Sequence, residues 1–107
     1  MEFEFIETAV FTKKIHGILN DEDYSALQKR LIEKPDLGVV IPGGRGIRKL
    51  RWSIANKGKS GGIRILYYLY LSQHQIYMLY VFKKSEQSDL SREKLSELGK
   101  YLENYLE

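Results

Sequence analysis

Phenylalanine and glutamate alternate at the start of the chain, and the apolar positions then take up helical spacing. Residues 2–5 read Glu-Phe-Glu-Phe, which predicts a short strand with one apolar side. From about residue 8 to residue 19 the apolar positions recur every three or four residues. That period predicts a helix directly after the strand.

A second helix is marked at both of its ends. Asn20 is a residue type that caps helix N-termini, and three acidic residues follow it in the first turn, where the helix dipole favours negative charge. Pro35 ends this helix because proline has no amide hydrogen with which to continue it. Glycine and proline crowd residues 35–46, which are therefore expected to form a loop.

Three segments in the second half of the chain have the pattern of strands. Residues 47–54 alternate between apolar and polar side chains, and residues 63–71 and 76–82 are strongly apolar. The links between them are a basic, glycine-rich connector at 55–62 and a turn at 72–75. Because both links are short, the three strands are expected to form an antiparallel meander.

A last helix is predicted from near Ser91, because leucines then line one face at helical spacing. These leucines are Leu95, Leu98, Leu102 and Leu106. The predicted order is an N-terminal strand, two helices, a three-stranded antiparallel meander and a C-terminal helix, in one domain over residues 1–107. This is an α+β fold, and we expect its helices to pack on one face of the sheet.

Composition excludes several kinds of chemistry. The 107 residues include no cysteine, which excludes disulfides, thiol catalysis and thiolate metal sites. No apolar run approaches the roughly 18 residues needed to cross a bilayer, and the acidic N-terminus lacks the basic region of a secretory signal, so we expect a cytoplasmic protein without membrane contact. His16 and His74 lack metal-ligand spacing and no nucleophile elbow is present, so neither a metal nor another cofactor is expected.

Basic residues are concentrated in the middle of the chain. Residues 43–84 hold nine of them and no aspartate or glutamate, whereas the flanks hold the other eight and all fourteen acidic residues. The net charge of +3 therefore conceals a strongly basic segment. Such segregation indicates a polyanionic partner such as nucleic acid, the alternative being a basic surface that arose by chance or serves solubility.

The meander is expected to bring several basic side chains together. In antiparallel strands the entrance to the second strand and the exit of the third lie at the same edge, which is where Arg64 and the end of the third strand fall. The candidate catalytic group is Arg64, Lys83, Lys84, Lys57 and Lys59. The alternative is a solvated rim of basic residues, with Arg64 extending its charge into solvent.

Several short runs, in their order along the chain, resemble the RelE/HigB toxins of type II toxin–antitoxin systems, within the RelE/ParE superfamily. They are residues 47–51 (IRKLR), 61–68 (GGIRILYY), 82–86 (FKKSE) and 89–91 (DLS). The start of the second helix and the Lys-Gly-Lys-x-Gly-Gly connector are most similar to the HigB branch. The resemblance extends over nearly the whole chain.

The resemblance implies a metal-independent endonuclease that cuts mRNA, usually in the ribosomal A site, and so inhibits translation. It also implies a cognate antitoxin of helix-turn-helix type that blocks the toxin. Some RelE proteins place a catalytic tyrosine in the final helix, whereas residues 88–92 contain none. Tyr67, Tyr68 or Tyr70 could replace it only by facing the cleft.

Roles for individual residues also follow from the resemblance. Arg64 corresponds to the strand arginine of the family. The family's basic pair before that strand corresponds to Lys57 and Lys59. Its basic residue after the last strand corresponds to Lys83 or Lys84. We further expect RNA to be bound by neighbouring strand side chains, namely Arg48, Lys49, Arg51 and Tyr68.

RNA cleavage is physically reasonable without histidine, because the 2′-OH of RNA can attack the adjacent phosphorus in line. Arg64 would stabilise the developing charge, since arginine stays protonated and binds phosphate through two bonds. A lysine can act as a base where neighbouring cations lower its pKa, and any of the four lysines fits that role. Two alternatives remain: a ParE-like inhibitor of DNA gyrase, and a non-catalytic RNA-binding or ribosome-binding module that stacks bases on Trp52 and the strand tyrosines.

Overall fold

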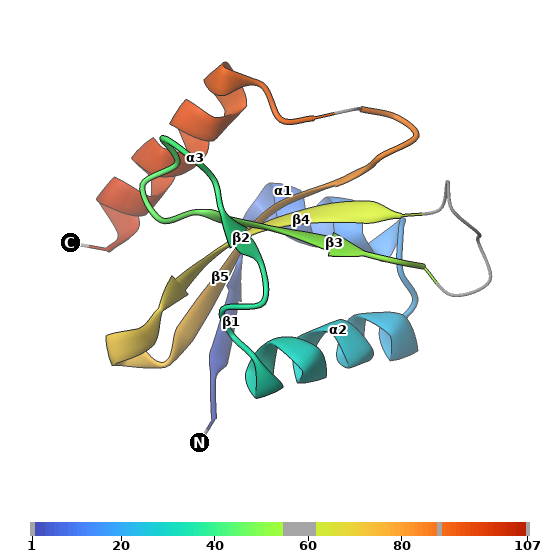
Figure 1. Ribbon diagram of the computed structural model, residues 1–107. Helices are drawn as coiled ribbons and strands as arrows, with labels where there is room; N and C mark the ends of the chain where they lie inside the picture. The colour runs from blue at the N-terminus through green and yellow to red at the C-terminus, as the bar shows by residue number, and fades with distance from the viewer. Residues whose placement is uncertain (1, 55–61, 88, 107) are drawn as a thin grey trace.

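A computed structural model describes residues 2–54, 62–87 and 89–106 of the chain (Figure 1). Its elements are β1 (Glu4–Glu7), α1 (Ala9–His16), α2 (Asp21–Glu33), β2 (Val39–Val40), β3 (Arg48–Trp52), β4 (Ile63–Tyr70), the 3₁₀ turn η2 (Leu71–Gln73), β5 (Gln75–Lys83) and α3 (Arg92–Tyr105). Among these residues, no helix is both long and apolar enough to span a membrane.

The five strands form one sheet in the order β1-β5-β4-β3-β2. The predicted antiparallel meander is confirmed as β3, β4 and β5. At one edge β1 pairs with β5 in the parallel direction, which the sequence pattern did not indicate. At the other edge Val39 and Val40 form a two-residue strand against β3, so the prediction that residues 35–46 are only a loop was wrong there. Two β-branched residues suit a strand, but the surrounding glycines and prolines hid them.

All three helices begin at a polar cap. The predicted caps Asn20 and Ser91 are confirmed, because their side chains accept hydrogen bonds from the amides of Asp23 and Lys94 at 2.8 and 3.1 Å. Thr8 caps α1 in the same way and also donates its hydroxyl to the Leu79 carbonyl at 2.8 Å, tying the helix to β5. The first helix ends at His16, three residues before its predicted end.

Helices cover both faces of the sheet, so the expectation that they pack on one face was wrong (Figure 1). The helices α1 and α2 pack on the side of Ile63 and Ile65, whereas α3 packs through Leu98 and Leu102 on the side of Leu66. The reason lies in β4, which is apolar on both faces and therefore needs cover on both. The basic residues of the meander consequently divide between an α3 side and an α1–α2 side.

Candidate nucleic-acid interface

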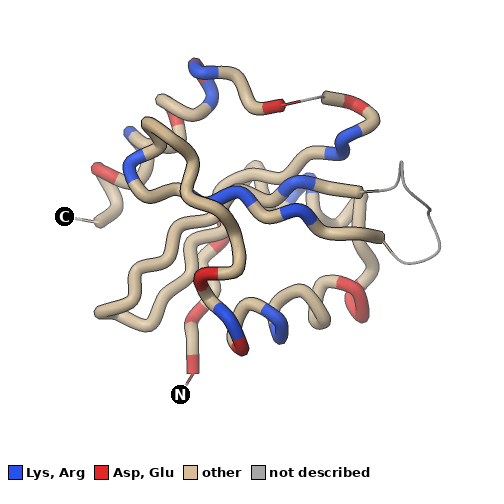
Figure 2. The backbone as a smooth tube through the Cα atoms, in the orientation of Figure 1, with Lys and Arg blue, Asp and Glu red and all other residues tan. Residues whose placement is uncertain are grey.

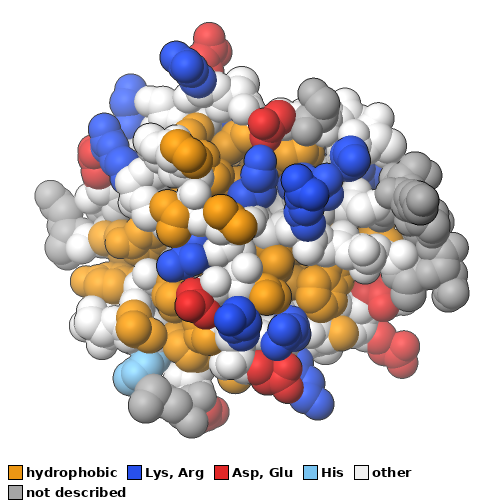
Figure 3. Space-filling view, in the orientation of Figure 1, with side chains coloured by type: hydrophobic (Ala, Val, Ile, Leu, Met, Phe, Trp, Pro, Cys, Tyr) orange, Lys and Arg blue, Asp and Glu red, His pale blue; other side chains and the backbone are white. Residues whose placement is uncertain are grey.

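Three basic side chains project from the meander toward the α3 side of the sheet. Arg51 of β3 is the direct register partner of Arg64 of β4, so their side chains leave the same face as close neighbours. Lys49 precedes Arg51 by two residues and therefore shares that face. We call Lys49, Arg51 and Arg64 the basic face; Figure 2 shows Lys and Arg at neighbouring points of β3 and β4. Figure 3 shows basic side chains clustered over this part of the sheet.

Arg64 is half-buried, and its own strand holds it in place. Its Nη1 donates to the carbonyl of Ile63 at 3.3 Å, and the same nitrogen would lie 3.6 Å from a Cβ at Gly62. The guanidinium therefore folds back over the start of β4, where glycine leaves room for it. No carboxylate among the described residues forms an ion pair with Arg64. The guanidinium is therefore not neutralised by a direct ion pair within the described part of the chain.

Asp89, in the segment between β5 and α3, brings an acidic group to the basic face. Its Oδ1 accepts hydrogen bonds from the Leu90 amide at 2.8 Å and from Lys49 Nζ at 3.2 Å. These two bonds, together with the nearby charge of Arg64, hold the pKa of Asp89 below its usual value. Sequence reasoning quoted Asp89 within the family motif but gave it no place in the site.

The end of β5 meets the start of β4, as the meander predicted. Lys83 pairs in register with Ile63, and the amide of Lys84 donates to the carbonyl of Gly62 at 3.2 Å. Because Ile63 lies on the α1–α2 side, Lys83 also leaves the sheet on that side and not with Arg64. Lys84 is exposed just beyond the strand. The structure therefore brings both lysines to the correct edge but not onto one face.

Arg48, expected to bind RNA, lies on the opposite side of the sheet from the basic face. Its register partner is Tyr67, a fully buried residue of the α1–α2 core, and its Nη1 donates to the carbonyl of Gly38 at 2.8 Å. The hydroxyl of Tyr67 donates to the Pro35 carbonyl at 2.7 Å and accepts from the Gly38 amide at 2.8 Å. Both side chains thus fasten the connection between α2 and β2.

The tyrosines of β4 differ in which side they face. Tyr67 faces the α1–α2 core and not the side of the basic face, whereas Tyr68 packs on the α3 side. Tyr68 lies four residues beyond Arg64 along the strand, a spacing of about 13 Å. It contacts the loop before β3, since a Cβ at Gly46 would lie 3.0 Å from its ring. Tyr68 is therefore on the expected side but removed from the basic face.

Two of the five candidate catalytic residues, Lys57 and Lys59, lie outside the described residues. The described part of the candidate site accordingly consists of Arg64 with Arg51 and Lys49, the exposed Lys84, and Asp89. It is a cationic surface with one acidic neighbour, suited to binding phosphate groups.

Known proteins share this architecture. A solved structure of the E. coli toxin RelE, an arginine-to-alanine double mutant in the free state, superposes with a TM-score of 0.61 at 18% sequence identity, covering 95% of this chain and 99% of that one. That likeness shows an α+β fold of the RelE kind, as predicted. The sequence profile described as "RelE toxin of RelE / RelB toxin-antitoxin system" matches residues 10–107. The chain belongs to the RelE toxin family and is a toxin of a toxin–antitoxin system.

Proposed function

We propose that this toxin is a metal-independent endoribonuclease of the HigB branch, which cuts mRNA in the ribosomal A site and is neutralised by a cognate antitoxin. The observation that carries the proposal is the direct register pairing of Arg51 with Arg64. Like charges directly opposite each other destabilise a sheet by a few tenths of a kcal/mol to about 1 kcal/mol. Phosphates bound along this face offset that repulsion, so the pair favours a polyanionic ligand.

Lys49 and Arg51 bind the phosphates that flank the cleaved bond and fix the register of the strand. Arg64, held against Ile63, grips the non-bridging oxygens of the reacting phosphate. Its position is set before RNA arrives, so the developing negative charge is met without reorganisation. This division of work places binding on β3 and charge stabilisation on β4.

The reaction is an in-line displacement within the RNA. The 2′-oxygen attacks the adjacent phosphorus as a base removes its proton, and the bond from phosphorus to the 5′-oxygen breaks, leaving a 2′,3′-cyclic phosphate and a protonated 5′-OH. Lys84 and Lys83, together with Lys57 and Lys59, are the candidates for the proton transfers. Tyr67 is a poor one, because its hydroxyl is bonded to Pro35 and Gly38 on the far side of the sheet.

Asp89 is also poorly suited to act as the base. A carboxylate that accepts two hydrogen bonds and has a lowered pKa binds a proton weakly. We assign it a positioning role: it holds the segment that leads to α3 against Lys49.

Mapping of mRNA 5′ ends after brief induction tests the proposal. We expect new ends within codons in cells that express the wild-type chain, and none with Arg64→Ala. Purified ribosomes programmed with mRNA should support cleavage that free mRNA does not. An unchanged pattern of mRNA ends, with growth arrest and loss of DNA supercoiling activity by gyrase, would instead support a ParE-like inhibitor. Arrest with RNA binding but without cleavage would support the non-catalytic module.

A further inference from the structure

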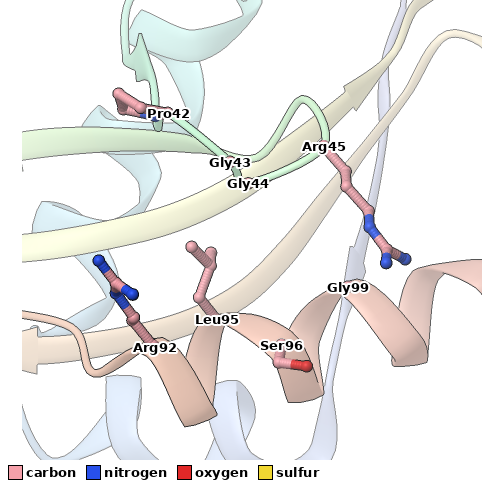
Figure 4. Close-up of a pocket in the computed structure, with 8 residues that line it drawn as sticks. All are labelled: Pro42, Gly43, Gly44, Arg45, Arg92, Leu95, Ser96 and Gly99. Carbon is pink, nitrogen blue, oxygen red and sulfur yellow. The ribbon is translucent and has the colours of Figure 1, made fainter.

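A cavity of about 370 Å³ lies between the 42–45 loop and the first half of α3, on the α3 side of the sheet (Figure 4). Sites for small molecules and cofactors fall in the same size range. The cavity has no part in the chemistry described above. The charge and polarity of its lining residues nevertheless indicate what kind of ligand it binds.

Both segments that form the cavity contribute an arginine. Arg92 extends from the first turn of α3 toward the loop, and Arg45 descends from the loop toward the helix at the other end (Figure 4). Pro42 and Leu95 supply an apolar wall, and no lining residue is acidic. Arg45 is paired with Glu103 further along α3, whereas Arg92 forms no ion pair with any residue that the structure describes. The cavity therefore combines an available positive charge with an apolar surface.

Backbone hydrogen bonds within the loop fix its shape. The Gly44 amide donates to the Ile41 carbonyl at 2.9 Å, and the Gly44 carbonyl accepts from the Ile47 amide at 3.0 Å. Gly43 has φ +74°, a backbone conformation that favours glycine, and a Cβ at Gly44 would make a tight contact of 3.1 Å with the Ile41 oxygen. Between the side chains of Pro42 and Arg45, the loop thus presents bare backbone at Gly43 and Gly44, which lets a flat ligand approach closely.

The cavity continues the basic face. Arg92 follows Asp89 by three residues, and Asp89 is bonded to Lys49 of the basic face at 3.2 Å. A strand whose phosphate lies on Arg51 and Arg64 can therefore pass over Lys49 and reach Arg92 within its next nucleotides. Charge and continuity together favour a nucleic-acid occupant over a neutral small molecule.

We propose that this cavity is a subsite for one nucleotide of the bound RNA, flanking the cleaved bond. The base lies against Pro42 and Leu95, and its phosphate is bound by Arg92. This inference rests on the proposed function, because it assumes that RNA lies on the basic face. The subsite would add a contact to the base and phosphate of the nucleotide that flanks the cleaved bond, separate from the contacts that the catalytic residues make to the reacting phosphate.

Binding of uncleavable RNA to the full chain tests the subsite. Oligonucleotides with 2′-deoxy sugars would be lengthened by one nucleotide at a time, at either end, and their Kd measured by fluorescence anisotropy. For the wild type we expect a gain of about tenfold in affinity at one length, on one end only, as expected for a charge-assisted contact. Arg92→Gln should abolish that gain, and Ser96→Met, which adds bulk at the cavity wall without altering charge, should reduce it.

Lys29→Gln is the matched control, since it removes one positive charge from α2 on the other side of the sheet. It should retain the length-dependent gain. A gain that persists in both cavity variants would overturn the subsite while leaving RNA binding intact. Loss of antitoxin binding without any change in RNA affinity would overturn it in favour of a protein contact. An absence of RNA binding by the wild type would overturn the proposed function and the subsite together.

Discussion

Arg51 and Arg64 are direct cross-strand partners, so the sheet places two like charges opposite each other where a pair of opposite or neutral side chains would be more stable. We expect Arg51→Gln to raise the free energy of unfolding by a few tenths of a kcal/mol to about 1 kcal/mol while weakening RNA binding. Urea unfolding at two salt concentrations would measure the gain, which should shrink as salt screens the repulsion. A loss of stability would contradict the repulsion argument.

Arg64 should matter most for the chemical step. We expect Arg64→Ala to reduce cleavage by about 10²- to 10³-fold, the typical effect of removing a group that stabilises transition-state charge. Arg64→Lys should restore little, because lysine cannot grip phosphate at two points. Single-turnover cleavage with saturating RNA separates this effect from binding. Near wild-type cleavage by a folded Arg64→Ala protein would show that the assigned site is wrong.

Asp89 partly neutralises the basic face, so Asp89→Asn should bind uncleavable RNA several-fold more tightly and depend more steeply on salt. The amide can still accept from Leu90, which should preserve the local fold. Should this substitution abolish cleavage without altering RNA affinity, Asp89 would belong to the chemistry instead of to positioning.

Asp89 also gives a pH prediction. Its folded-state pKa is lowered, so its contribution to stability is present above the unfolded value of 3.8 and is lost as the pH falls through the folded pKa. The difference in unfolding free energy between the wild type and Asp89→Asn should therefore be constant from about pH 5 to 8 and shrink only below that window. A change near neutral pH would show that another group is responsible.

Tyr67 should prove structural. Tyr67→Phe leaves the buried Gly38 amide without its acceptor, and we expect it to cost about 1–3 kcal/mol of unfolding free energy. Cleavage below the unfolding transition should remain near wild type, because the hydroxyl lies on the side away from the basic face. Urea midpoints and cleavage rates of the same preparations would test both halves of this prediction.

Salt dependence reports how many phosphates the basic face contacts. For single-stranded RNA the slope of log affinity against log salt is about 0.7 per neutralised phosphate, so Lys49→Gln or Arg51→Gln should each reduce it by about that amount. Arg48→Gln is a useful comparison, because its guanidinium is bonded to Gly38 on the other side. If all three variants reduced the salt-dependence slope equally, the side of the sheet on which a residue lies would not decide whether it contacts RNA.

Local signals in the sequence predicted much of the fold. Asn20 and Ser91 act within one helical turn, and the short link before β5 forces an antiparallel neighbour, so these features needed no knowledge of the rest of the chain. The strand at Val39 exists only because β3 lies beside it, and the docking of α3 depends on an apolar face of β4 that any strand pattern leaves unassigned. Such features arise from tertiary contacts and are not visible in a window of residues.

For the site, the alternation in residues 47–54 placed Lys49 and Arg51 on one side of their strand, but the RNA-binding and catalytic groups were chosen by charge and not by side of the sheet. Arg48 and Lys49 are neighbours of similar charge, yet pleating sends them to opposite faces. The same alternation separates Lys83 from Arg64. Asp89 was missed because its partner Lys49 is forty residues away, and no local pattern links the two.

The parallel pairing of β1 with β5 at the edge of the sheet determines when the toxin can fold during its synthesis. β1 can pair only after Gln75 and the next residues of β5 have left the ribosome, and the other core is covered only once α3 has followed. Contacts between such distant parts of a chain form slowly. The sheet and both of its cores can therefore be completed only after β5 and α3 have emerged, so β1 remains unpaired while the residues between it and β5 are being synthesised.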